Sequence, residues 1–197
     1  MKGIVAGVVT LALASLLAGC ERTPSPPAFK LTDITGAPFG RELSLADHNG
    51  RARTLADFRG KVVTVFFGFT HCPDVCPTTL AEMSTVMREL GPDEQKVQVL
   101  FVTVDPERDT PQVLQKYVPS FHPGFLGLYG DADALARTAR EFKIVYQKQA
   151  LPGGGYSVDH SAGTYIFDAE GRLRLYASYG SGAAKLLHDI RILLQSS

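Results

Sequence analysis

The sequence predicts a mixed α/β domain in which a central mixed β-sheet is flanked by helices. Residues 62–69 and 97–104 are nearly continuous runs of β-branched, aromatic and other apolar residues, which is typical of strands buried on both faces. Stretches with apolar residues at helical spacing follow these strands. Because buried strands alternate with amphipathic helices, the strands are expected to form one sheet covered by helices.

The first half of the chain is predicted to contain short strands, two buried strands and two helices. Asn49-Gly50 is a hairpin signal among the short strands that come first. A helix between the two buried strands ends at Gly91-Pro92. Its apolar face is formed by Leu80, Met83, Val86, Met87 and Leu90. Residues 110–117 form the second helix, because a Thr N-cap precedes Pro at the first helical position.

The second half is predicted to contain two helices and five short strands. They are a brief strand at 126–129, a helix capped by Asp131, strands at 144–149 and 156–158 around a Pro-Gly-Gly-Gly loop, a hairpin of strands 164–167 and 172–176, and a helix that Ser181 opens. A β-α-β unit comes first along the chain and a β-β-α unit comes last. This order fits a thioredoxin-like domain with an N-terminal hairpin extension and inserted elements.

Composition is consistent with one globular domain. The chain has 197 residues, 45% of them apolar, and equal numbers of basic and acidic residues, 20 of each. This length is sufficient to bury a sizeable core. The zero formal charge argues against a nucleic-acid partner, which would need a basic surface.

The first 30 residues are expected to be a leader and a tether. A short positive start and an apolar stretch over residues 4–18 have the proportions of a signal peptide and are short for a membrane span. Leu17-Ala18-Gly19-Cys20 resembles a bacterial lipobox, in which Cys20 is lipidated after removal of residues 1–19. An uncleaved membrane anchor is the alternative. Residues 20–30 then form the lipidated cysteine and a Pro-rich tether, and residues 31–197 form the domain, on the extracytoplasmic side of the membrane.

Cys72 and Cys76 are the cysteines left for chemistry once Cys20 is assigned to lipid. A helix is expected to begin near Pro77, with Cys76 as N-cap, or with Thr79 as the cap. Either start places both sulfurs at a helix N-terminus, where the dipole lowers a thiol pKa. The pair can close a disulfide or hold one soft metal ion. A purely structural disulfide is disfavoured, because so small a loop removes little entropy from the unfolded chain.

A metal held by these cysteines needs a third ligand. Two thiolates suit Cu(I), Zn²⁺ or an iron–sulfur cluster, but two ligands are too few for a structural zinc site. His160 is the candidate third ligand. It follows the Gly-rich loop, at a point that a thioredoxin-like topology places beside the cysteine loop. His71 is expected to have a packing or supporting role. The other three histidines, expected to be solvated, are His48, His122 and His188.

Several other residues are weaker candidates. Met83 and Met87 are expected to be core residues of the helix face. Residues 105–109 carry three acids around Arg108 at a strand end and are expected to cap their own loop with local salt bridges. Asp74 and Asp159 flank the candidate ligands and are minor candidates for tuning charge or binding Cu(II).

Taken together, these motifs resemble the SCO/SenC family of copper-binding, thioredoxin-like assembly proteins. The resemblance covers most of residues 30–195. The segments that carry it are Gly60-Lys61, Phe67-Gly-Phe-Thr-His-Cys-Pro-Asp-Val-Cys-Pro77, Thr103-Val-Asp-Pro-Glu-Arg-Asp-Thr-Pro111 and Val158-Asp-His-Ser161. The resemblance implies that Cys72, Cys76 and His160 bind copper and that the chain helps to mature the dinuclear Cu-A centre of cytochrome c oxidase.

Two function classes therefore follow from the sequence. The first is a membrane-tethered copper chaperone, whose partners are the Cu-A-bearing oxidase subunit and another extracytoplasmic copper chaperone. The second is a thiol–disulfide oxidoreductase, which uses Cys72 and Cys76 as a redox-active pair to reduce the oxidase subunit's ligand cysteines. His160 discriminates between them, because a reductase needs only the two thiols. A peroxidase is disfavoured, since no Thr-x-x-Cys signature precedes the pair.

Overall fold

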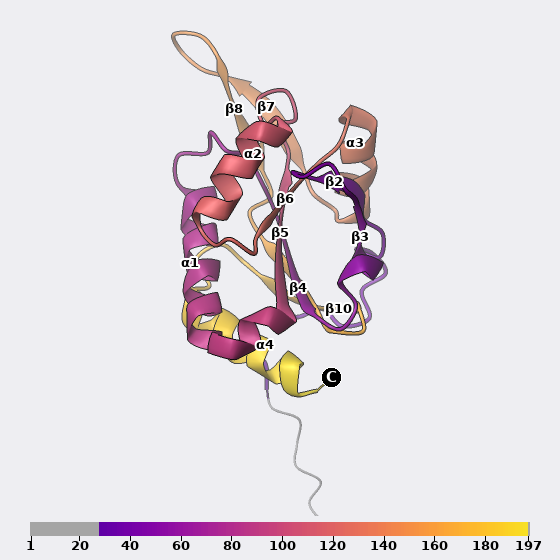
Figure 1. Cartoon of the computed structure of the whole chain (residues 1–197). Coiled ribbons are helices and arrows are strands. Elements are labelled where there is room, and N and C mark those ends of the chain that lie inside the picture. The colour runs from indigo at the N-terminus through magenta and orange to yellow at the C-terminus, as the bar shows by residue number, and fades with distance from the viewer. Residues whose placement is uncertain (1–27, 197) are drawn as a thin grey trace, which may run out of the picture.

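The computed structural model describes residues 28–196, and an eight-stranded mixed sheet runs through its centre (Figure 1). The strand order is β1-β10-β9-β4-β5-β6-β2-β3. Strands β4, β5 and β6 are parallel, and the other pairs are antiparallel. The bounds are β1 (Thr32–Asp33), β2 (Ser44–Asp47), β3 (Ala52–Thr54), β4 (Val62–Gly68), β5 (Val97–Thr103), β6 (Leu126–Tyr129), β9 (Thr164–Phe167) and β10 (Leu173–Ala177). The predicted mixed α/β fold is confirmed, including its N-terminal hairpin.

Within residues 28–196, four α-helices and three short 3₁₀ segments surround this sheet. They are η1 (Leu55–Phe58), α1 (Val75–Leu90), η2 (Gly91–Lys96), α2 (Pro111–Tyr117), η3 (Val118–Ser120), α3 (Ala132–Glu141) and α4 (Ala183–Gln195). Helices α1 and α4 pack against each other, and Figure 1 shows α3 across the sheet from them. The Ser84 hydroxyl on α1 donates to the carbonyl of Phe121, just after η3, so α2 and η3 lie on the α1 side.

The two central strands are buried along their whole length, as their apolar sequences predict. Side chains of β4 alternate between the two faces. Phe66 packs against Phe101 on the α1 side, and Phe67 packs against Phe142 at the end of α3. Apolar packing on both faces therefore fixes the carboxyl end of β4, which leads directly into the cysteine loop.

A second, two-stranded sheet stands apart from the main one. It is formed by β7 (Tyr146–Ala150) and β8 (Tyr156–His160), paired antiparallel. Four of the five β7 residues are exposed. Figure 1 shows this hairpin extending beyond the body of the molecule. His160 is the last residue of β8.

Two helix starts differ from the sequence prediction. Helix α1 begins at Val75, so Cys76 lies in its first turn instead of capping it. Pro77 is accommodated there because the first-turn amides have no intrahelical acceptor, and a missing N–H costs nothing. Helix α4 begins after Gly182, because the Ser181 hydroxyl donates to the carbonyl of Ser178 and does not cap the helix.

The predicted leader (residues 1–19) and the lipidation site Cys20 lie outside the described residues. The described chain begins on the body of the domain: the amides of Lys30 and Leu31 donate to the buried carboxylate of Asp189 on α4. Between residues 28 and 196, none of the helices has the length and apolar character needed to cross a bilayer.

Candidate metal centre

The two cysteines lie where β4 passes into α1. Cys72 is in the connecting loop and partly exposed, whereas Cys76 is in the first turn of α1 and completely buried. The Cys76 amide donates to the Cys72 sulfur at 3.4 Å, and both thiols are free. The loop thus brings the two sulfurs together without a disulfide.

Burial sets the chemistry of Cys76. It raises the pKa of this thiol well above its ordinary value, and the neighbouring Cys72 and Asp109 raise it further. The sequence-based expectation that the helix terminus would lower the pKa of both thiols is therefore wrong for Cys76. Removal from water outweighs the helix dipole here, because no cation is close enough to compensate a buried thiolate among the described groups that affect its pKa. A bound cation would supply that compensation.

Gly68, at the end of β4, makes room for the Cys76 sulfur. A Cβ atom at this position would lie 2.7 Å from Cys76 Sγ and 2.9 Å from Phe101 Cε2. Any side chain there would displace the sulfur or the ring. Sequence pattern alone does not reveal this role of Gly68, because the contact joins a strand end to a helix turn.

His160 faces the cysteines from the separate β7–β8 hairpin. Its Nε2 atom lies 3.7 Å from Cys76 Sγ, and its Nδ1 atom lies 3.0 Å from the carbonyl oxygen of Ser161. Because a carbonyl only accepts hydrogen bonds, Nδ1 carries the ring proton and Nε2 presents a lone pair to the sulfurs. The rings of Phe66 and Phe69 pack against the imidazole in T-shaped arrangements.

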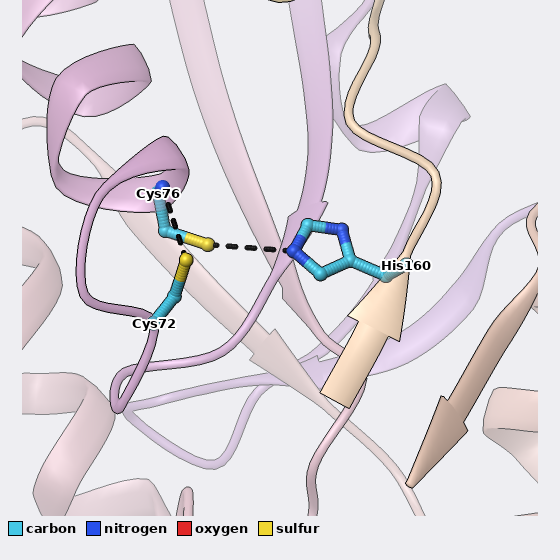
Figure 2. Close-up of side chains that lie close together, drawn as sticks. All are labelled: Cys72, Cys76 and His160. Atoms are coloured by element: carbon cyan, nitrogen blue, oxygen red, sulfur yellow. Dashed lines mark hydrogen bonds between the residues drawn. The ribbon is translucent and has the colours of Figure 1, made fainter. Parts of the chain in front are cut away.

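Cys72, Cys76 and His160 form the three-ligand cluster that the sequence predicts (Figure 2). One ligand atom from each residue lies within 4.8 Å of the other two. Two sulfurs and one imidazole nitrogen are a donor set suited to soft metals, Cu(I) in particular. The arrangement lacks the fourth protein ligand of a structural zinc site.

The loop after β5 supports the cysteine loop. The buried Asp109 carboxylate accepts hydrogen bonds from the Thr70 amide at 3.0 Å and the Thr70 hydroxyl at 2.6 Å. The Thr103 hydroxyl donates to the same carboxylate at 2.7 Å. The sequence predicts only local capping by this acidic run, and the Asp105–Arg108 ion pair is indeed local. Asp109, however, bonds to Thr70, which lies 39 positions earlier in the sequence.

The remaining histidines lie outside the cluster. His71 is mostly exposed, with Nδ1 4.0 Å from Asp109. His122 pairs with Glu94, and His188 with Asp189. The expectation that His48 is solvated is wrong: it is buried and its Nδ1 accepts from the Gly127 amide, because the β2–β6 pairing covers it.

Of the weaker candidates, the two methionines lie where the sequence predicts. Met83 and Met87 are buried in the core. Asp74 and Asp159 are exposed, and the described metal cluster does not include them. Asp74 accepts hydrogen bonds from the hydroxyls of Thr78 and Tyr179 instead.

Comparison with known proteins gives a consistent result. Residues 32–195 match the family model described as SCO1/SenC. The bovine mitochondrial protein SCO2 homolog is 42% identical over 153 residues, which cover 76% of this chain and 58% of the relative. The chain thus spans less than two thirds of that relative's length.

Two solved structures extend the comparison. Apo Sco1 from Thermus thermophilus is 42% identical, with a TM-score of 0.75 over 85% of this chain and 98% of that one. ScoI from Bradyrhizobium japonicum, determined with copper bound, is 38% identical, with a TM-score of 0.71 over 78% of this chain and 98% of that one.

Proposed function

The chain belongs to the SCO1/SenC family, and we propose that it is a copper chaperone that acts in the assembly of cytochrome c oxidase. In this proposal Cys72, Cys76 and His160 bind one copper ion, which the protein delivers to the Cu-A site of the oxidase or uses to prepare that site. The observation that carries the proposal is the convergence of the three ligand atoms within 4.8 Å.

A three-ligand site suits a carrier. Because coordination is low, a thiolate of the recipient can add to the metal before a ligand of the carrier leaves. Oxidation of Cys72 and Cys76 to a disulfide would release the metal, so metal occupancy depends on redox state. The orientation of His160 Nε2 toward the sulfurs supports metal binding over simple thiol chemistry.

The test is a Cu(I) competition titration of the reduced, full-length chain in detergent without oxygen. We expect one tightly bound equivalent in the wild type. Each of Cys72→Ser, Cys76→Ser and His160→Ala should weaken binding by about a hundredfold or more, since each removes one of three ligands. His71→Ala is the matched control, because His71 neighbours Cys72 but lies outside the cluster. Binding by His160→Ala that equals the wild type would contradict the three-ligand site.

Transfer needs its own measurement. Cu(I)-loaded protein is mixed with the apo Cu-A-bearing subunit, the two proteins are separated after a set time, and the copper content of each is measured. Copper should move from the wild type within minutes, and His71→Ala should behave in the same way. Failure of the wild type to transfer, although it binds copper, would argue against the delivery role.

The alternative function is reduction of the oxidase subunit's ligand cysteines. It is favoured by the asymmetry of the pair: Cys72 is accessible to an external disulfide, and the buried Cys76 could resolve the mixed disulfide. This activity requires both thiols and not His160. Reductase activity that survives in His160→Ala, together with wild-type copper binding in that variant, would favour this reading.

We also propose that Cys20 is lipidated and tethers the domain to the extracytoplasmic face of a bacterial membrane. The sequence Leu17-Ala18-Gly19-Cys20 supports this proposal. Mass spectrometry of the mature N-terminus is expected to find residues 1–19 removed and Cys20 acylated. Cys20→Ser should leave the leader attached; cleavage without acylation in the wild type would contradict the proposal.

A further inference from the structure

The β7–β8 hairpin that carries His160 needs an anchor to the body of the domain. It shares no strand pairing with the eight-stranded sheet in the described chain, and isolated two-stranded hairpins are marginally stable. The side chains of residues 156, 158 and 160 lie on the same face of β8, because successive side chains of a strand point to opposite faces. On this face Val158 is buried and His160 meets the cysteines, so Tyr156 at the start of the strand determines how that end is held.

Tyr156 is held by the loop after β5, most closely by Asp105 and Arg108 and more weakly by Glu107, whose carboxylate lies 3.5 Å from the tyrosine hydroxyl. Its hydroxyl donates to Asp105 Oδ1 at 2.8 Å, and its carbonyl accepts from Arg108 Nη1 at 2.9 Å. The Arg108 guanidinium carbon lies 3.8 Å from the centre of the Tyr156 ring. Arg108 Nε in turn pairs with Asp105, whose carboxylate is completely buried. Asp105, Arg108 and Tyr156 therefore contact one another.

A further ion pair connects the same loop to the other strand of the hairpin. Lys148 Nζ on β7 lies 2.6 Å from Glu107 Oε1, and it stands 4.6 Å from the centre of the Tyr156 ring. Both partners of this pair are largely exposed, so it contributes little by itself. The buried Asp105 is the stronger attachment, because a hydrogen bond to a charged, desolvated acceptor is worth more than one exposed to water.

The five residues 105–109 therefore contact both halves of the metal centre. Asp109 at one end binds Thr70, two residues before Cys72. Asp105 and Arg108 bind Tyr156, four residues before His160. One rigid loop thereby sets the position of the histidine strand relative to the cysteine loop.

We propose that Tyr156, held by Asp105 and Arg108, is a positioning residue that keeps His160 Nε2 within reach of the two sulfurs. Tyr156 lies about 13 Å along the strand from His160 at the usual rise per residue, so it acts through the strand and not on the metal. A hairpin released at Tyr156 can swing away from the cysteines, of which Cys76 remains fixed in the core. The inference rests on the proposed copper site and deepens it.

The first test follows the apo protein, without copper. Hydrogen exchange of the full-length, reduced chain is compared between wild type, Tyr156→Leu and Tyr156→Phe. Tyr156→Leu keeps apolar volume but loses the hydroxyl and the ring face, and should speed exchange across 146–160 while leaving residues 75–90 unchanged. Tyr156→Phe retains the ring that stacks on Arg108 and should show a smaller change. Unchanged exchange over 146–160 in Tyr156→Leu would overturn the proposal.

The second test is a double-mutant cycle on Cu(I) affinity. Tyr156→Leu should weaken binding about tenfold, a loss typical of residues that orient a metal ligand, and Tyr156→Phe about threefold. In the His160→Ala background Tyr156→Leu should have less than about a twofold effect, because the positioned ligand is gone. Tyr146→Phe is the matched control: it removes a hydroxyl from the partner strand, and within residues 28–196 that hydroxyl has no hydrogen-bond partner. It should bind like the wild type.

A spectroscopic signature separates positioning from general destabilisation. In the Cu(II) form, the nitrogen hyperfine coupling from His160 should weaken in Tyr156→Leu and persist in Tyr146→Phe. An equal Tyr156→Leu effect in the wild-type and His160→Ala backgrounds would overturn this inference alone. Equal copper binding by the wild type and His160→Ala would overturn the copper site itself, and this inference with it.

Discussion

The cysteine half and the histidine half of the metal centre are held by different forces. Cys76 is completely buried between α1 and the central strand β4, every residue of which is also buried. His160 lies on a hairpin outside the main sheet, and most residues of its partner strand β7 are exposed. Apolar packing around Cys76, together with the hydrogen bonds of Asp109 to the cysteine loop, fixes the first half. A few hydrogen bonds and a buried ion pair fix the second.

This difference indicates how a carrier can bind metal firmly and still release it. The Cys76 sulfur is preorganised, because the core would have to open before it could move. The imidazole can leave by movement of a hairpin whose loss exposes little apolar surface. Four predictions test this difference between the two halves, in order of decreasing expected effect.

The two thiols should differ in reactivity by about a hundredfold or more, because only thiolate attacks an alkylating agent and burial both shields Cys76 and raises its pKa. The measurement is the alkylation rate of each cysteine by iodoacetamide in the reduced apo chain, read by peptide mass spectrometry. In concentrated guanidinium chloride the two rates should converge. Equal rates in the native protein would mean that the cysteine half is not preformed.

Gly68→Ala should lower the free energy of unfolding by about 1–3 kcal/mol, the usual cost of overpacking a core. The added methyl group would lie 2.7 Å from Cys76 Sγ and 3.0 Å from Phe66 Cε1, so the sulfur has to shift and Cu(I) affinity should also fall. Urea unfolding and Cu(I) titration measure the two effects. Gly124→Ala is the control, since its closest contact is 3.3 Å, to the imidazole of His122. Wild-type affinity in Gly68→Ala would show that the sulfur position tolerates displacement.

Acid should weaken the main sheet through Asp168, at the turn between β9 and β10. Burial raises the pKa of Asp168, but hydrogen bonds from Arg172 and Arg174 outweigh it and hold the pKa below its ordinary value. A carboxyl whose folded pKa is lowered stabilises the protein above its unfolded pKa, and this contribution is lost as pH falls through the folded value.

The corresponding measurement is urea unfolding of wild type and Asp168→Asn at several pH values. At pH 7 the variant should be less stable by about 1–2 kcal/mol, since charge-assisted hydrogen bonds are lost. The gap between the two proteins should narrow as pH falls below about 4. A constant gap across this range would contradict the assignment.

The smallest effect is expected from replacing a glycine of positive φ at the tip of the β7–β8 hairpin. Gly154 has φ +98° and open space around its Cα, so Gly154→Ala should cost about 1 kcal/mol of backbone strain. Gly50 in the β2–β3 turn has φ +80° and equally open surroundings, so Gly50→Ala is a matched control in the main sheet.

The two variants should differ in where the strain appears. Gly50→Ala should lower the global free energy of unfolding by about 1 kcal/mol, while Gly154→Ala should only speed hydrogen exchange within β7 and β8. Equal losses of global stability would show that the hairpin unfolds together with the core. The distinction between the two halves would then fail.

Local pattern accounts for the parts of the fold that were predictable. The buried runs at 62–69 and 97–104 became β4 and β5, because a segment apolar on both faces is stable only in the middle of a sheet. Helix starts were less predictable. Val75 and Ala183 begin their helices through turn geometry, and no cap side chain marks either start.

The sequence by itself determined the donor set. Apart from Cys20 it contains only two cysteines, Cys72 and Cys76, and their order relative to His160 fits a topology that brings all three together. The sequence did not determine the pKa of Cys76 or the need for a glycine at position 68 beside the Cys76 sulfur. It also did not determine that residues 105–109 contact both the cysteine loop and the β7–β8 hairpin. These depend on contacts between residues such as Thr70 and Asp109, or Arg108 and Tyr156, that are 39 and 48 positions apart. Only the tertiary structure decided them, because desolvation and hydrogen-bond partners are set by which distant segments exclude water from each other.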